Sequence, residues 1–168
     1  MTDIHFIIGS TGAGKTTYAG ALARERRALR FSIDEWMQEL FAHDLAGADF
    51  TAVGERVERA RRQIWQVAAQ AHSLSVACVF DTGLLTRASR EQARDEAARR
   101  GMAAHFHYVA APAETRWARI AARNAARNET FTFEVTRPMF DFIETIWQAP
   151  DADERGLPGL TMIGAEAA

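Results

Sequence analysis

Short apolar runs alternate with amphipathic segments along the chain. Residues 4–8 form a β-branched and aromatic run that is typical of a strand, and residues 17–27 have the alanine-rich character of a helix. A second brief strand is expected at 30–33, after which Asp34 begins a helix that reaches about residue 40. From 51 to about 72 apolar residues recur at helical intervals. The first half of the chain therefore predicts strand, helix, strand and two helices.

The same alternation continues in the second half. Residues 76–81 are a continuous apolar run that ends in a carboxylate, as expected of a buried parallel strand. The remaining expected elements are a helix at 88–100, a strand at 104–109, helices at 115–127 and 137–147, a loop at 150–159 and a strand at 160–163. Strands that alternate with helices predict an α/β fold with about five parallel strands between two helical layers.

The length of 168 residues is that of one domain, and the chain shows no internal linker. We therefore expect residues 1–168 to form a single domain. In such folds ligands bind at the carboxyl ends of the strands. We therefore expect the chemically active residues to follow the expected strands.

The turn after the first strand carries the most specific motif. It reads Gly-Ser-Thr-Gly-Ala-Gly-Lys-Thr and satisfies the pattern G-x-x-x-x-G-K followed by Ser or Thr. Its glycines allow successive backbone N–H groups to point inward at the start of a helix, which favours polyphosphate binding. The expected nucleotide-binding residues are Gly9, Ser10, Thr11, Gly12, Ala13, Gly14, Lys15, Thr16 and Thr17.

Two residues of this motif have distinct expected roles. Lys15 reaches the β- and γ-phosphates of a nucleotide, and the Thr16 hydroxyl ligates Mg²⁺. Lys15 is the single lysine among the 20 basic residues of the chain. Because every other cation is arginine, this position has kept a compact and flexible ammonium group.

Two carboxylates are expected at the same edge of the sheet. Asp34 is a candidate for orienting and deprotonating an acceptor hydroxyl, and its alternative role is that of a helix N-cap. Asp81 ends the buried strand and is a candidate Mg²⁺ ligand, with a simple strand-end turn as the alternative.

Four arginines, Arg116, Arg119, Arg123 and Arg127, lie on one side of the helix expected at about 115–127. Because acidic residues flank the row only at its ends, we interpret the helix as a lid over a polyphosphate, with Arg119 and Arg123 stabilising the transferred group. An exposed arginine face is the alternative.

Other side chains are less specific. Arg87 and Arg90 either contact an anionic substrate or occupy a solvated helix face, and Cys78 is expected to be a buried thiol. Aromatic residues that either frame an acceptor pocket or belong to the core are Trp36, Phe41, Phe50 and Trp65.

Composition sets limits on location and partners. The net charge of −2 gives no general attraction to nucleic acid or to anionic membranes. No apolar run has membrane-spanning length and the first residues do not resemble a signal peptide, so a cytoplasmic location is expected by default. The histidines show no metal-ligand spacing.

With these positions in hand, the chain resembles small bacterial P-loop kinases of the AAA-type ATP-binding domain family. These are akin to zeta toxins, chloramphenicol phosphotransferase and the 5′-kinase domain of polynucleotide kinase. The residues that carry the resemblance are 9–16, Phe-Ser-Ile-Asp-Glu-Trp-Met at 31–37, Val-Phe-Asp-Thr-Gly at 79–83, Arg-Ile-Ala-Ala-Arg-Asn at 119–124 and Phe-Glu-Val-Thr at 133–136.

The resemblance implies an adenylate-kinase-like P-loop fold, ATP as donor, Asp34 as the catalytic carboxylate, and Arg119 and Arg123 as lid residues. The chain departs from ring-forming AAA+ machines, because Thr82 and not glutamate follows Asp81. A ring motor is therefore not expected.

The expected function is transfer of the γ-phosphate of ATP, with Mg²⁺, to a hydroxyl of a small molecule such as a nucleoside, sugar or antibiotic. The alternatives are a regulatory ATP-binding module and a 5′-hydroxyl polynucleotide kinase, although the net charge does not support a nucleic-acid acceptor. The acceptor pocket is expected between about Trp36 and Ala71, and the protein is expected to be a monomer or a homodimer.

Overall fold

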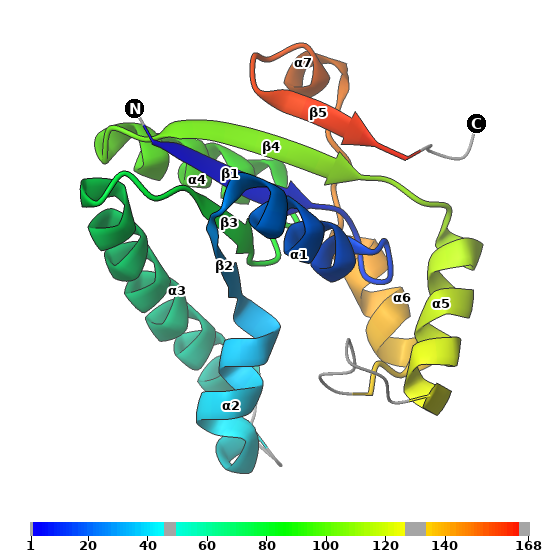
Figure 1. The fold of residues 1–168 in the computed structure, drawn as a ribbon. Coiled ribbons are helices and arrows are strands. Elements are labelled where there is room, and N and C mark those ends of the chain that lie inside the picture. The colour runs from blue at the N-terminus through cyan, green and yellow to red at the C-terminus, as the bar shows by residue number, and fades with distance from the viewer. Residues whose placement is uncertain (1, 46–49, 127–133, 165–168) are drawn as a thin grey trace.

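The computed structural model describes residues 2–45, 50–126 and 134–164, and within them it contains a five-stranded parallel sheet (Figure 1). The order of the strands is β2-β3-β1-β4-β5. In chain order the elements are β1 (Asp3–Ile8), α1 (Lys15–Arg26), β2 (Leu29–Ser32), α2 (Ile33–Leu45), α3 (Phe50–Ser73), β3 (Cys78–Asp81), α4 (Arg87–Arg99), β4 (Ala103–Val109), α5 (Ala113–Ala126), α6 (Arg137–Ile146), α7 (Ala152–Arg155) and β5 (Leu160–Ile163).

The central strand β1 is buried on both faces, which explains its continuous apolar sequence. Its neighbours are β3, with Ile4 opposite Cys78, and β4, with Ile4 opposite Ala104. Because successive side chains of a strand point to opposite faces, Phe6 packs in one layer of the core and Ile7 in the other.

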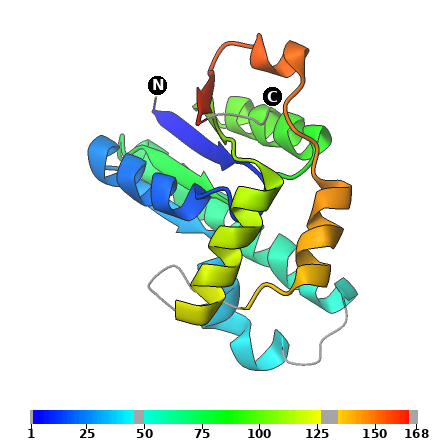
Figure 2. The ribbon, with the colours of Figure 1, turned by 90° about the vertical axis from the view of Figure 1, so that its right-hand side faces the viewer.

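Helices cover both faces of the sheet. Helix α1 packs Ala19 and Leu22 against Ile7 and Val79 on one face. Helices α3 and α4 cover the other face, where Ile64 of α3 joins a larger core that contains Phe6, Phe80 and Phe106. Figure 2 shows α1 and α4 on opposite sides of the strands. The expected three-layer α/β/α fold with five parallel strands is thus confirmed.

Helices α5 and α6 lie beside each other past the carboxyl end of β4 (Figure 1). A small separate cluster of Ile120, Val135 and Phe140, with Trp117 against it, holds them together. This pair of helices brings its inner side chains to the edge of the sheet where the loop before α1 is located.

Most expected elements are present, with boundaries that differ by a few residues. One helix was not expected: α7 lies inside the segment interpreted as a loop, and the Asp151 carboxylate caps it by accepting a hydrogen bond from the Glu154 N–H at 2.9 Å. Cys78 is buried, as expected, and burial raises the pKa of its thiol to about 11. Within the part of the chain that the structure describes, no helix is both long and apolar enough to span a membrane.

The start of α2 corrects one alternative. Helix α2 begins at Ile33, and the hydroxyl of Ser32 accepts a hydrogen bond from the Glu35 N–H at 3.4 Å. Ser32 therefore stands in the capping position, and Asp34 lies within the first helical turn. The interpretation of Asp34 as an N-cap is wrong, and its carboxylate remains available for other contacts.

Candidate functional site

The loop between β1 and α1 has the backbone conformation that its glycines allow. Gly12 has φ 79° and Gly14 has φ 101°, both in the left-handed region. A Cβ atom at Gly12 would lie 2.6 Å from the carbonyl oxygen of Arg116, so helix α5 approaches the loop too closely for any side chain. These positions require glycine for the turn and for the packing of α5.

The N-terminus of α1 forms a site for an anion. Helix α1 begins at Lys15, and its capping residue Gly14 supplies no side-chain acceptor for the first N–H groups. Such N–H groups, at the positive end of the helix dipole, favour a phosphate. The ammonium of Lys15 donates a hydrogen bond to the Ser10 carbonyl oxygen at 3.1 Å, which holds it over the loop.

The next residue of the motif contacts the carboxylate at the end of β3. The Thr16 hydroxyl donates a hydrogen bond to Asp81 Oδ2 at 2.8 Å, across 65 residues of sequence. Asp81 is buried, and β3 places it beside the start of α1. These two oxygen donors fit Mg²⁺, which prefers hydroxyl and carboxylate oxygens.

Asp34 faces the same space from the first turn of α2. Its carboxylate is open to the cleft, and no hydrogen bond to it occurs among the described residues. The surrounding protein raises the pKa of Asp34 by limiting its hydration, and the negative charge of Asp81 raises it further, while Lys15 and Arg123 act in the opposite direction. A carboxyl with such a pKa can accept a proton from a bound hydroxyl.

These groups line one cleft of about 580 Å³. Its polar wall comes from the loop before α1, the start of α2 and the end of β3. Its apolar wall comes mainly from α5 and α6. The lining residues that carry these properties are Gly12, Gly14, Lys15, Thr16, Thr17, Asp34, Asp81, Arg119, Arg123, Ile120, Met139 and Ile143.

Two of the expected lid arginines line this cleft. Arg119 donates a hydrogen bond to the carbonyl oxygen of Ala13 at 3.2 Å, which brings α5 against the loop. The Nε atom of Arg123 is enclosed without a hydrogen-bond partner. Burial lowers the pKa of Arg123, and the charge of Asp34 partly compensates. Both guanidinium groups are placed to meet an anion in the cleft.

Arg116 does not belong to this stripe. Its guanidinium is buried and donates two hydrogen bonds to the Glu144 carboxylate of α6, at 2.8 and 2.5 Å. The expectation that Arg116 faces a polyphosphate with the rest of the row is wrong, because Glu144 of another helix supplies its counter-charge. The expected fourth member, Arg127, lies outside the described residues.

Glu144 supports the site and was not expected from the sequence. It also accepts a hydrogen bond from the Ser10 hydroxyl at 2.5 Å, so one carboxylate joins α5, α6 and the loop before α1. One sequence signal pointed to it. Glu144 follows Phe140 by four residues, which puts a carboxylate on the apolar face of an amphipathic helix.

The remaining motif residues have different environments. Thr11 and Thr17 line the cleft. The side chains of Ser10 and Ala13 are buried away from it, against Glu144 and the core respectively. A phosphate at this loop would therefore meet the backbone of Ser10 and Ala13.

Arg87 and Arg90 do not contact the cleft. Arg90 is fully buried and donates two hydrogen bonds to the Glu154 carboxylate of α7, at 2.8 and 2.6 Å. Arg87 is exposed and pairs with Glu91 and Asp151. Arg90 therefore neither contacts a substrate nor lies on a solvated helix face, which were the two alternatives. Its partner Glu154 is 64 residues away and was not apparent from the local sequence.

Solved structures share this fold at low sequence identity. Kti12 from Chaetomium thermophilum, in complex with ADP-AlF3, has a TM-score of 0.71 at 16% identity, over 95% of this chain and 88% of that chain. The APS kinase CysC of Mycobacterium tuberculosis, in complex with AMPPNP and APS, has a TM-score of 0.67 at 19% identity, over 99% and 90%. A sugar kinase from Janibacter sp. HTCC2649 has a TM-score of 0.65 at 19% identity, over 97% and 85%.

No curated protein matches the sequence. The sequence profile of the AAA domain family matches residues 4–144, a range that contains the loop at 9–16, Asp34, Asp81 and the arginines of α5. This range covers most of the chain. The protein is therefore a member of the AAA domain family.

Proposed function

We propose that this protein is a kinase that transfers the γ-phosphate of ATP to a hydroxyl group of a small molecule. One observation carries the proposal: Asp34 lies in the same cleft as Lys15 and Thr16, while Ser32 and not Asp34 caps the start of α2. A nucleotide site without a nearby acceptor base is sufficient for binding or hydrolysis. A carboxylate beside it is suited to activating an alcohol.

Each residue has a role in this reaction. The N–H groups at the start of α1 and the ammonium of Lys15 bind the phosphates. Asp34 orients the acceptor hydroxyl and takes its proton as the acceptor oxygen bonds to the γ-phosphorus; the bond from that phosphorus to the β,γ-bridging oxygen breaks, and ADP leaves. Arg119 and Arg123 stabilise the negative charge on the transferred group. Thr16 and Asp81 would hold Mg²⁺, which neutralises phosphate charge when bound.

A small acceptor agrees with the shape and charge of the cleft. Its volume of about 580 Å³ is in the range of small-molecule sites, and Met139 and Ile143 of α6 form part of its wall. A polynucleotide acceptor requires a basic path to Asp34, whereas the chain has a net charge of −2. The similarity to a sugar kinase and an APS kinase supports a phosphoryl acceptor, without selecting one.

The test is transfer of radiolabel from γ-³²P-labelled ATP to a panel of nucleosides, sugars, aminoglycosides and 5′-hydroxyl oligonucleotides. We expect a labelled product with one class of small molecule. Asp34→Asn should lower its rate by about 10²- to 10⁴-fold with ATP affinity retained, whereas Lys15→Ala should weaken ATP binding itself.

A regulatory ATP-binding module is the competing function. It predicts tight ATP binding, no labelled acceptor, and an Asp34→Asn variant that behaves as the parent protein. That set of results would overturn the kinase proposal.

A further inference from the structure

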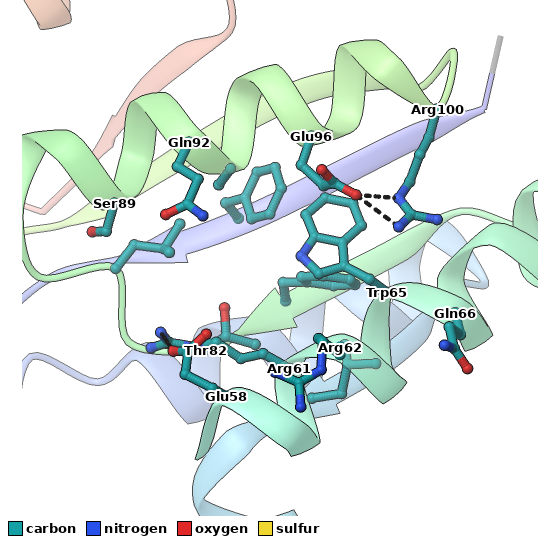
Figure 3. Close-up of a pocket in the computed structure, with 15 residues that line it drawn as sticks. Glu58, Arg61, Arg62, Trp65, Gln66, Thr82, Ser89, Gln92, Glu96 and Arg100 are labelled. Atoms are coloured by element: carbon teal, nitrogen blue, oxygen red, sulfur yellow. Dashed lines mark hydrogen bonds and ion pairs between the residues drawn. The ribbon is translucent and has the colours of Figure 1, made fainter. Parts of the chain in front are cut away.

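A second cavity lies on the face of the sheet that α3 and α4 cover (Figure 3). It has a volume of about 340 Å³, and its floor is formed by Phe6 of β1 and Phe80 of β3. We call this space the α3–α4 groove. Its walls carry a mixture of arginines, carboxylates and amides that packing of the core does not require.

The groove has an excess of positive charge. The three cations that line it are Arg61, Arg62 and Arg100, against the carboxylates Glu58 and Glu96. Glu96 is already paired with Arg100, and it also pairs with Arg99 outside the groove. Arg62 is exposed and takes part in none of the ion pairs among the described residues. An anion at this wall would therefore be attracted and not repelled.

Arg61 supplies an unused donor. One end of its guanidinium donates a hydrogen bond to Glu58 at 2.8 Å and the other to the Thr82 carbonyl oxygen at 3.0 Å. Its Nε atom is fully enclosed and has no hydrogen-bond partner. An acceptor does not reach this enclosed Nε, but each terminal nitrogen carries two hydrogens and uses one of them, so Arg61 keeps donors for an anion in the groove.

Trp65 forms an aromatic wall beside these cations. Its ring packs edge-on against Phe80 at 5.0 Å between centroids and lies 6.0 Å from Phe6, so the indole has a fixed position. The guanidinium of Arg100 lies 5.4 Å from the Trp65 ring. Across the groove, Gln92 of α4 adds an amide (Figure 3). The wall thus presents a flat apolar surface next to hydrogen-bonding groups.

The α3–α4 groove and the cleft are separate. None of the residues that line one lines the other. After β3, Thr82 and Leu84 face the groove, whereas Asp81 and Gly83 face the cleft. A ligand in the groove would therefore leave the nucleotide position at the start of α1 accessible.

We propose that the α3–α4 groove is a second binding site, for a small organic anion that carries a phosphate or a carboxylate on a flat apolar body. Arg61 and Arg62 bind the anionic group, and Trp65 packs against the body. Because Arg61 also binds the Thr82 carbonyl oxygen, a ligand on Arg61 acts on the backbone next to Asp81. The proposal concerns binding and does not depend on the kinase activity.

Isothermal titration calorimetry tests this with phenyl phosphate and benzoate as probes, which distinguish phosphate from carboxylate. Inorganic phosphate carries only the anionic group of such a ligand, and phenol carries only its flat aromatic body. The titrations are made with the full chain saturated with a non-hydrolysable ATP analogue and Mg²⁺. We expect one site for phenyl phosphate or benzoate, with weaker binding of inorganic phosphate and of phenol.

Charge reversal at the rim identifies the site. Arg62→Glu should weaken binding of the probe by about tenfold or more. Arg59→Glu is the matched control, because Arg59 is an exposed arginine of α3 that does not line the groove. It should change the affinity by less than about twofold. Circular dichroism of both variants should match that of the parent.

Three results would overturn the proposal. One is the absence of binding of every probe up to about 10 mM. The second is binding that the ATP analogue abolishes, which would place the probe at the nucleotide position. The third is equal weakening by Arg62→Glu and Arg59→Glu, which would show a diffuse charge effect.

Discussion

Ser10 donates its hydroxyl hydrogen to the carboxylate of Glu144 at 2.5 Å, although 134 residues separate the two. The bond joins the nucleotide-binding loop to α6, and Glu144 also binds the buried guanidinium of Arg116. Hydrogen bonds from Arg116 and from Ser10 lower the pKa of Glu144, against the effect of burial. This carboxylate therefore positions the loop against both α5 and α6.

Removing Glu144 should destabilise the fold more than removing an exposed acid. In Glu144→Ala the buried charge of Arg116 loses its partner, so we expect the free energy of unfolding to fall by about 2–4 kcal/mol. Asp141→Ala on the same helix removes an exposed pair with Arg137 and should cost less than about 0.5 kcal/mol. Urea denaturation of both variants measures the difference. Equal losses would contradict the structural role of Glu144.

Removing the buried ion pair between α4 and α7 should have a similar effect. Glu154→Ala leaves the Arg90 guanidinium charged in a buried position, and we expect a loss of about 3 kcal/mol in thermal or urea unfolding. Arg87→Ala, which breaks exposed pairs, should change stability by less than about 1 kcal/mol. An altered KM for ATP or for the acceptor in Arg87→Ala would show that Arg87 contacts a substrate, contrary to its position outside the cleft.

Activity should decline in acid through the raised pKa of Asp34. The carboxylate must be ionised to accept a proton, so kcat/KM falls as pH drops through its pKa, which lies above the ordinary value of 3.8. A pH profile of kcat/KM measured with the identified acceptor should show this decrease at low pH. The residual activity of Asp34→Asn should not show it. If kcat/KM of the variant still decreased at low pH, the titration would belong to another group.

Stability should also decrease between about pH 6.5 and 4 because of His107. Burial, with the neighbouring charge of His5, lowers the pKa of His107 from 6.5 to about 4, and its ring accepts or donates hydrogen bonds with Tyr18 at 2.9 Å and His5 at 3.0 Å. The unfolded chain thus binds a proton in this window and the folded chain does not. Stability is retained above the unfolded pKa and is lost as pH falls.

The free energy of unfolding should fall by about 2 kcal/mol between pH 6.5 and pH 4. Urea unfolding at a series of pH values measures it, and His107→Gln should flatten the dependence. Because His5 is coupled to His107 and its pKa is lowered as well, part of the slope should remain in the variant. An unchanged slope would show that other groups cause the dependence.

Local sequence was sufficient for the type and order of most elements. The apolar run of β1 and the helical period of α3 are each contained in one stretch of chain, and the glycines before Lys15 specify their own backbone conformations. The alternative interpretation of Asp34 as an N-cap is wrong because α2 begins at Ile33, one residue before Asp34, so that Ser32 accepts the hydrogen bond from the Glu35 N–H.

The tertiary structure determined which charged residues pair when they are distant in the sequence. Sequence alone was enough to predict a phosphate-binding loop with Lys15 and Thr16 in it, because the motif lies within a single turn. It also selected Arg119 and Arg123, which line the cleft, but it gave no partner for Arg116 or Arg90. Arg116 pairs with Glu144, 28 residues away, and Arg90 pairs with Glu154, 64 residues away. Such pairings depend on how the helices pack, since a buried cation is satisfied by whichever carboxylate the fold brings to it.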